Sequence, residues 1–105
     1  MEHFDKIALI KRVKNNDSLL SKLIEIAKED IPEDIKTLEI QFKNAEYSKM
    51  KETAHSIKGT GLNMSFDYLA EIALELEKIN ETEYNSIPEL ITSLKNEFAL
   101  LLKEL

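Results

Sequence analysis

Hydrophobic positions recur every three or four residues along most of this chain, which is the spacing of one face of an α-helix. The longest such stretch follows Asp17, a residue type that often caps helices. Its stripe consists of Leu20, Ile24, Ala27, Ile31, Ile35, Leu38, Phe42 and Ala45. Pro32 lies inside the stripe, and a proline removes one hydrogen bond from a helix interior. Because the stripe passes Pro32 without a change of phase, we favour one long kinked helix; a second helix capped by Asp30 is the alternative.

The remaining segments predict one short helix before this stretch and three helices after it. The expected helices cover residues 4–14, residues 47–63, a segment capped by Ser65, and a segment that begins at the capping-box pattern of Ser86 and Glu89. A polar loop over residues 80–85 separates the last two. Their apolar stripes are Phe4, Ile7, Ala8 and Lys11; Tyr47, Met50, Ala54, Ile57, Gly61 and Met64; Phe66, Leu69, Ala73 and Leu76; and Ile87, Ile91, Leu94, Phe98, Leu101 and Leu105.

Amphipathic helices joined by short connections bury their stripes against one another. The chain has 105 residues with only two glycines and two prolines, too few for the turns of a β-sandwich or an α/β fold of this length. We therefore expect an all-α fold, an up-down four-helix bundle with a short additional N-terminal helix. Residues 1–105 are expected to form a single domain.

Charge and composition restrict the class of protein. The net charge of −6 argues against a nucleic-acid surface, and no apolar run is long enough for a membrane span or a signal peptide. Cysteine is absent and the two histidines lie far apart in sequence, so we expect no metal site. A cytoplasmic monomer without a cofactor is the expectation, with His3 only a residue of a mobile N-terminus.

Both glycines of the chain, Gly59 and Gly61, fall in the third predicted helix. A glycine inside a helix costs roughly 1 kcal/mol relative to alanine, so two within one turn indicate a special requirement. At 100° per residue Gly61 faces the core, where close packing explains it, but Gly59 faces outward. His55 lies on the same outward side, one turn before Gly59. An exposed histidine in mid-helix beside a glycine therefore deserves a chemical explanation.

A neutral imidazole can attack a phosphoryl group and hold it as a phosphoramidate. Such a transfer needs access for a bulky partner, positive charge near the phosphoryl oxygens, and an imidazole fixed in one tautomer. Gly59 supplies access because it has no Cβ, and Lys58, at the border with the core, supplies charge. Lys51 on the preceding turn is more simply a solvated charge. The outward side as a whole consists of Ser48, Lys51, Glu52, His55, Gly59 and Leu62.

The segment AHSIKGTGLNMS, residues 54–65, resembles the signature of histidine phosphotransfer (HPt) domains, which runs Ala-His-x-Leu-Lys-Gly-Ser-Ala with a hydrophobic residue and a glycine further on. The resemblance covers nearly the whole chain. It implies a four-helix bundle that relays phosphoryl groups between receiver-domain aspartates. The resemblance implies that His55 is the phosphorylated residue. Lys58 would supply positive charge to the phosphoryl group, and Gly59 would leave space beside the imidazole for the partner. Glu77 takes the position of the family's Gln or Glu that orients the imidazole.

The chain departs from that signature at three positions, none of them at His55, Lys58 or Gly59. Ile57 replaces a leucine of equal volume, and Gly61 replaces an alanine or serine. Ser65 stands where the family usually has a glycine, at the turn after the histidine-bearing helix.

The resemblance also implies a phosphocarrier rather than an enzyme, with no ATP site. The Mg²⁺ of the transfer belongs to the partner receiver domain, which docks on residues around His55. We expect that surface to include Ser48, Lys51, Glu52 and Leu62, with Leu19, Leu23 or Ile26 from the long helix. Two alternatives remain: a phosphoacceptor domain of a chemotaxis-type histidine kinase, and a helical adaptor bundle that is never phosphorylated.

Overall fold

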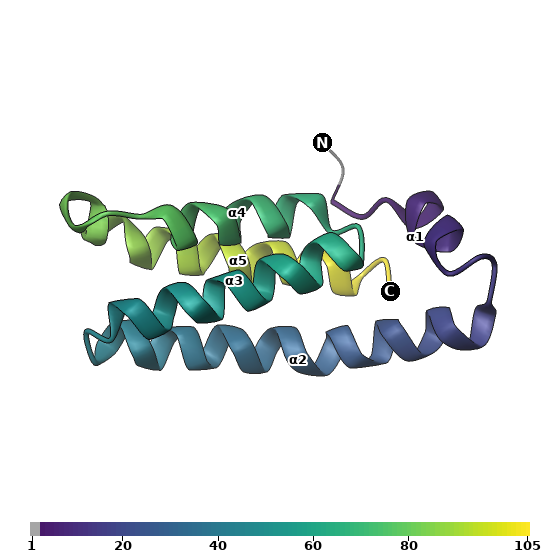
Figure 1. The fold of residues 1–105 in the computed structure, drawn as a ribbon, viewed down its shortest axis with the longest axis horizontal. Helices are drawn as coiled ribbons and strands as arrows, with labels where there is room; N and C mark the ends of the chain where they lie inside the picture. Colours follow the sequence, from purple (N-terminus) through teal and green to yellow (C-terminus); the bar gives the residue numbers. More distant parts are fainter. Residues whose placement is uncertain (1–2) are drawn as a thin grey trace.

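The computed structural model describes residues 3–105, which form five α-helices and one 3₁₀ helix without a strand. The elements are α1 (Lys6–Arg12), α2 (Asp17–Lys43), α3 (Tyr47–Asn63), α4 (Asp67–Lys78), η1 (Glu81–Ser86) and α5 (Ile87–Leu102). Helices α2 to α5 run side by side along the long axis, and α1 lies across one end of them (Figure 1). The predicted all-α bundle with a short N-terminal helix is confirmed. Within residues 3–105 no helix has both the length and the apolar character that crossing a bilayer requires.

The long helix α2 continues through Pro32 for 27 residues, so the alternative of a separate helix capped by Asp30 is wrong. The predicted cap at Asp17 is also wrong, by one residue. Asn16 has the extended backbone of a cap, and its side chain accepts a hydrogen bond from the Leu19 amide at 3.0 Å. Lys14 and Asn15 take left-handed conformations that close the preceding turn, which leaves Asn16 to start the helix.

The predicted apolar stripes of α2 to α5 form the core, except that Ala45 is exposed in the left-handed turn that follows α2. The fully buried members with the largest side chains come from every helix of the bundle: Ile31 and Leu38, Met50 and Ile57, Leu69 and Leu76, and Leu94 and Leu101. The stripe predicted for the first helix is wrong, because Ile7 is 70% exposed and Leu9 is the residue of α1 that reaches the core. Since α1 crosses the end of the bundle instead of lying along it, a single residue rather than a continuous stripe enters the core (Figure 1).

Of the caps predicted for the last two long helices, Ser86 does hold the N-cap position of α5, but Ser65 does not cap α4. Ser86 makes no side-chain cap to α5; a capping box formed by Asn80 and Glu83 instead starts η1, where a loop was expected. Helix α4 begins after Phe66, and Ser65 belongs to the turn that ends α3. The Ser65 amide donates to Leu62 O at 3.2 Å, and its carbonyl accepts from the Asp5 amide at 3.0 Å.

Ser65 has a strained backbone conformation and a buried hydroxyl group without a hydrogen-bond partner in the described chain. Its φ is 59°, in the left-handed region, and its hydroxyl is buried without a hydrogen-bond partner among the described residues. Both features cost free energy in a non-glycine residue, about 1 kcal/mol or more each. They explain physically why a glycine suits this turn.

We therefore expect Ser65→Gly to raise the free energy of unfolding by about 1 kcal/mol, after the larger chain entropy of an unfolded glycine is subtracted. Urea unfolding followed by circular dichroism measures the change. The matched control is Ser65→Ala, which removes the buried hydroxyl but keeps the left-handed backbone strain. It should raise the free energy of unfolding by less than Ser65→Gly does. A lower stability of the glycine variant would contradict this account.

The N-terminal segment is anchored at His3, contrary to the expectation of a mobile end. His3 Nδ1 lies 2.6 Å from Oε2 of Glu97, whose side chain is only 6% exposed, and the His3 ring stacks on Tyr68. Phe4 meets Phe66 edge to face. A buried carboxylate requires a partner, and His3 supplies it from the opposite end of the chain.

Candidate functional site

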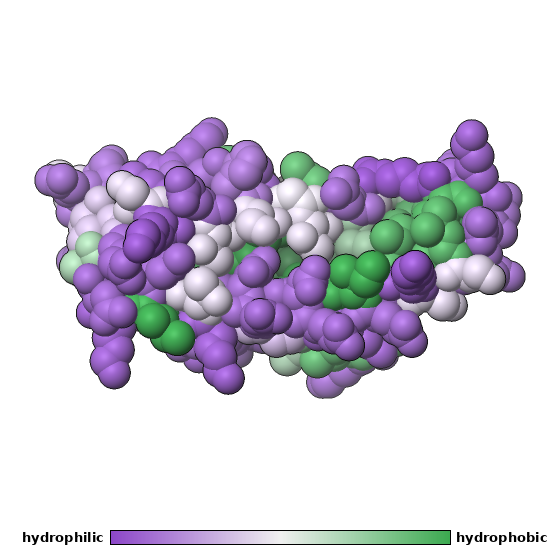
Figure 2. All heavy atoms as spheres, turned by 60° about the horizontal axis from the view of Figure 1, so that its bottom comes forward, coloured by the Kyte–Doolittle hydropathy of each residue, from purple (hydrophilic) through white to green (hydrophobic). Residues whose placement is uncertain are grey.

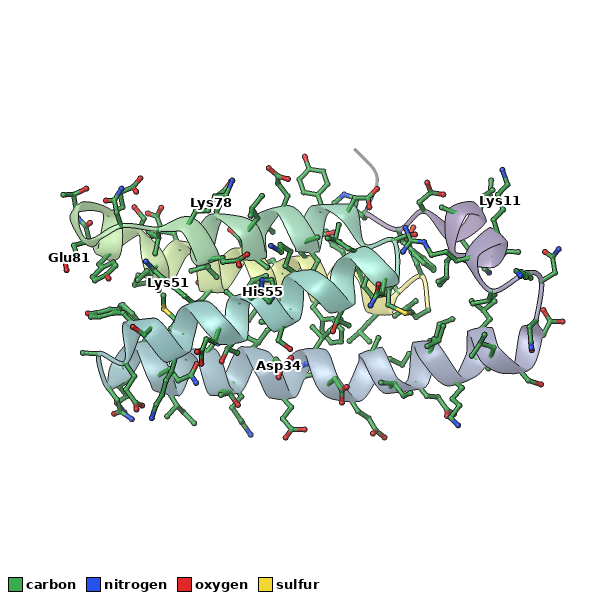
Figure 3. The ribbon with its side chains drawn as sticks, in the orientation of Figure 1. Lys11, Asp34, Lys51, His55, Lys78 and Glu81 are labelled. Atoms are coloured by element: carbon green, nitrogen blue, oxygen red, sulfur yellow. The ribbon has the colours of Figure 1, made fainter. Side chains whose placement is uncertain are left out.

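Helix α3 presents one face to the core and the other to solvent, as the sequence predicts. Met50, Ala54, Ile57 and Gly61 are buried. The His55 side chain, on the opposite face, is 66% exposed. It stands in the middle of the helix on an open side of the bundle (Figure 3). A partner can therefore reach the imidazole without unfolding any part of the chain.

Glu77 of α4 holds the imidazole and the neighbouring lysine together. Its Oε2 lies 2.7 Å from His55 Nδ1, and its Oε1 lies 2.6 Å from Lys58 Nζ. His55 and Lys58 are three residues apart, so they project from one side of α3 toward the same carboxylate on α4. The structure thus brings together three residues that sequence reasoning had singled out separately.

The shared carboxylate determines which nitrogen of His55 carries the proton. Hydrogen bonds from Lys58 and from His55 hold the pKa of the Glu77 carboxyl below its ordinary value of 4.5, so the group is ionised at neutral pH. An ionised carboxylate only accepts hydrogen bonds. The proton of a neutral His55 therefore resides on Nδ1, and the lone pair of Nε2 faces outward. This is the tautomer that a nucleophilic imidazole needs.

Replacing Glu77 should produce a pH-dependent loss of stability. A carboxyl group whose pKa is lowered by folding stabilises the folded state above its ordinary pKa, and this contribution disappears as the pH falls through the folded-state pKa. We expect Glu77→Gln to lower the free energy of unfolding at neutral pH, and the difference from the wild type to narrow steadily as the pH falls below about 4.5. Urea unfolding at a series of pH values measures it.

The control for this series is Glu75→Gln, at an exposed carboxylate of the same helix with no ion-pair partner in residues 3–105. It should show a much smaller difference at neutral pH. A Glu77 effect that is the same at neutral and acid pH would mean that the lowered pKa does not contribute to stability.

Lys58 combines burial with charge. Its side chain is 22% exposed, so the ammonium group is held at the boundary between α3 and α4 and is not extended into solvent. A cation in this partly desolvated position interacts more strongly with a nearby anion than a freely solvated lysine does. It can therefore stabilise negative charge that arrives beside His55.

The two glycines occupy opposite environments, which agrees with their predicted directions. A Cβ built on Gly59 meets no heavy atom within 4 Å, so packing inside this chain does not require a glycine there. A Cβ built on Gly61 lies 3.2 Å from Ala70 Cβ and 3.3 Å from Phe66 O, so a side chain there would push against α4 and the turn before it. Gly59 keeps a surface next to His55 free of side-chain atoms.

The predicted docking residues lie around the histidine as follows. A shallow hollow of about 380 Å³ is lined by Lys51, Glu52, His55 and Glu77. A second hollow of about 270 Å³ lies between α3 and α4 and includes Lys58 and Leu62. Leu62 is 49% exposed, and Ser48 is exposed one turn beyond Lys51.

Hydrophobic side chains also gather at the end of the molecule where α1 and the first half of α2 lie (Figure 2). Leu19 and Ile26 are 41% and 43% exposed, and Ile7 of α1 is more exposed still. Leu23, the third residue suggested for docking on this helix, is instead partly buried and packs against the core.

Sequence reasoning missed Arg12, the chain's single arginine. Its guanidinium donates to the carbonyl of Leu62 at the C-terminal end of α3, which fastens α1 to the histidine-bearing helix. The last carbonyls of a helix lack partners within the helix, and a cation there is favourable. The only signal in the sequence was an unpaired arginine in an amphipathic helix, which does not identify a contact 50 residues away.

The comparisons with known proteins agree with this geometry. The Hpt domain family matches residues 22–104, and the chain belongs to this family. The match leaves out α1 and the first residues of α2. Neither the curated proteins nor the solved structures gave a match. Membership implies histidine phosphotransfer in a phosphorelay, and Hpt domains are phosphocarrier domains that interact with receiver domains.

Proposed function

We propose that this protein relays phosphoryl groups between receiver-domain aspartates, with His55 as the phosphorylated residue. The observation that carries the proposal is the exposed imidazole whose Nδ1 is hydrogen-bonded to Glu77 at 2.7 Å. In the neutral ring, that bond puts the proton on Nδ1 and leaves Nε2 as the nucleophile on an exposed side chain. Proximity of Lys58 to the same carboxylate places a positive charge beside the ring.

In the transfer, Nε2 of His55 attacks the phosphorus of an aspartyl phosphate on the receiver. The N–P bond forms as the bond between phosphorus and the aspartyl oxygen breaks, and the aspartate leaves as a free carboxylate. The proton on Nδ1 stays in its hydrogen bond to Glu77, which stabilises the positive charge that develops on the ring. The reverse reaction passes the group to a second receiver.

Lys58 and Gly59 assist this step in different ways. Lys58 exchanges part of its interaction with Glu77 for the phosphoryl oxygens, so its ammonium neutralises their charge. Gly59 lets the receiver's phosphorylated loop approach the imidazole without meeting a side chain. The Mg²⁺ that accompanies the transfer is held by the receiver domain, and the reaction takes place in the cytoplasm.

The receiver docks over the exposed apolar and polar residues around His55. Leu62 supplies an apolar contact one heptad after the histidine, and Ser48, Lys51 and Glu52 border it on the other side. Leu19 and Ile26 extend the apolar surface onto α2. Apolar contacts next to a polar centre are typical of protein interfaces.

The experiment that tests this function is transfer from a phosphorylated receiver domain to the purified chain. We expect an acid-labile, base-stable phosphoryl group on the chain, as a phosphohistidine requires, and return of the group to an unphosphorylated receiver. Labelling by an ATP-binding kinase domain, but by no receiver, would instead assign the chain to a chemotaxis-type kinase. No labelling by either would leave only the adaptor function.

A further inference from the structure

A long apolar groove lies between α2 and α5, on the side of the bundle away from His55. Its wider part, about 460 Å³, has a floor that includes Phe42, Pro88 and Ile91. Its narrower part, about 240 Å³, contains Pro32, Ile35 and Phe98. Glu39 and Lys95 line both parts, and their ion pair crosses from α2 to α5 between the two hollows.

Ile35, Ile91 and Phe98 in the groove are core residues, but the exposed Ile40 is not needed for the core. Ile40 lines the groove and is 54% exposed, more than any other large hydrophobic residue in the described chain except Ile7. Contiguous exposed apolar surface of this kind marks sites of protein contact. From Pro32 to Lys43 the groove extends along twelve residues of α2, or about 16 Å at the helical rise.

The charges along the groove are opposite to those of the protein as a whole. The chain carries 20 acidic and 14 basic residues, yet Lys36, Lys43 and Lys95 line the groove against a single carboxylate, Glu39. That carboxylate is neutralised by Lys95 at 2.8 Å. Within residues 3–105, Lys36 and Lys43 form no ion pair. The α2 edge of the groove is therefore positive.

From the exposed Ile40 and the positive α2 edge together we infer that this groove is a second docking surface, and that it binds an amphipathic helix with an acidic flank from a partner protein. The backbone groups of α2 and α5 are satisfied inside their own helices, so an extended peptide would find no backbone partner there. A helix brings its own satisfied backbone and inserts a stripe of side chains between two others. Carboxylates along one flank of that helix would meet Lys36 and Lys43, which lie two turns apart on the α2 edge of the groove.

The position of the groove allows it to be occupied during phosphotransfer. Helix α2 packs on α3 and on α5, and α4 packs on α3 and on α5, so the α2–α5 side is opposite the α3–α4 side that carries His55 and Glu77. In Figure 1, α5 lies behind α3. A partner held in the groove can thus remain bound while a receiver docks on the other side.

The test uses the full chain and a stapled synthetic helix of about three turns, because a free helix of this length is unstable in water. One peptide has a leucine stripe flanked by glutamates, and the matched peptide has lysines in place of the glutamates. We expect the acidic peptide to bind, measured by fluorescence anisotropy, and to shift the amide resonances of α2 and α5 around Ile40 and Ile91. Ile40→Glu and Lys43→Glu should each weaken binding at least about tenfold.

The control for charge is Lys11→Glu. It changes the net charge by the same amount as Lys43→Glu, but Lys11 lies on α1 at the other end of the molecule (Figure 3). It should leave peptide binding unchanged, and Ile40→Glu should leave phosphotransfer to His55 unchanged. Equal binding of the basic peptide, or resonance shifts on α3 and α4, would overturn the assignment. So would a dimer of this chain that Ile40→Glu dissociates, because the occupant would then be a second copy.

Discussion

His55→Gln is expected to reduce labelling by a phosphorylated receiver domain to background while leaving the protein folded. Glutamine has no nucleophilic ring nitrogen, so the N–P bond cannot form. Its side-chain amide is of similar length and can still donate to Glu77, and the position is 66% exposed. We therefore expect the free energy of unfolding to change by no more than about 0.5 kcal/mol.

The second histidine provides the matched control. His3→Gln should accept the phosphoryl group as well as the wild type does, because His3 lies at the Glu97 contact and not on the outward face of α3. It should nevertheless be less stable, since the buried Glu97 carboxylate depends on that ring. Undiminished labelling of His55→Gln, or loss of labelling in His3→Gln, would show that the phosphorylated residue has been assigned wrongly.

The position of the helices could be predicted from the sequence because it depends on local periodicity. Residues 47–63 were predicted as the third helix, and α3 has these bounds. The opposite directions of Gly59 and Gly61 followed from the same angular spacing. A stripe of buried residues repeats several times within one helix, so an error at one position does not change the result.

The ends of the helices could not be predicted as well, because tertiary contacts decide them. Whether Ser65 caps a helix or closes a turn depends on the Asp5 amide that binds its carbonyl, a contact between residues 60 apart. The anchoring of His3 on Glu97 spans 94 residues. Capping residues are common in sequences, and only the folded backbone selects which of them cap.

The site was predicted partly from chemistry and partly from resemblance. His55, Lys58 and Gly59 are close in sequence, so helical geometry alone brings them together. Glu77 lies on another helix and was placed only by resemblance to the family; the structure puts it 2.7 Å from the imidazole. The groove between α2 and α5 gave no signal, because Ile40 lies off the core stripe as an isolated apolar residue.

Variants of the two glycines distinguish the effect of access to His55 on the transfer rate from the effect of core packing on stability. Gly59→Leu should slow phosphotransfer from a receiver about a hundredfold, because a side chain next to the imidazole holds the partner away by an ångström or more. The same change should leave the melting temperature equal or higher, since the added Cβ meets no atom of this chain and leucine favours the helix over glycine.

Gly61→Ala should have the opposite pair of effects. Its Cβ would lie 3.2 Å from Ala70 Cβ and 3.3 Å from Phe66 O, so α3 and α4 must separate slightly, at a cost of about 1–3 kcal/mol, of which the higher helix propensity of alanine returns roughly 1 kcal/mol. Because Gly61 faces the core, the outward surface around His55 is unchanged. The folded fraction of the variant should therefore transfer phosphoryl groups at the wild-type rate. Stopped-flow transfer rates and thermal unfolding of the two variants measure both quantities. If Gly59→Leu transferred at the wild-type rate, clearance beside His55 would not be why this helix tolerates an exposed glycine.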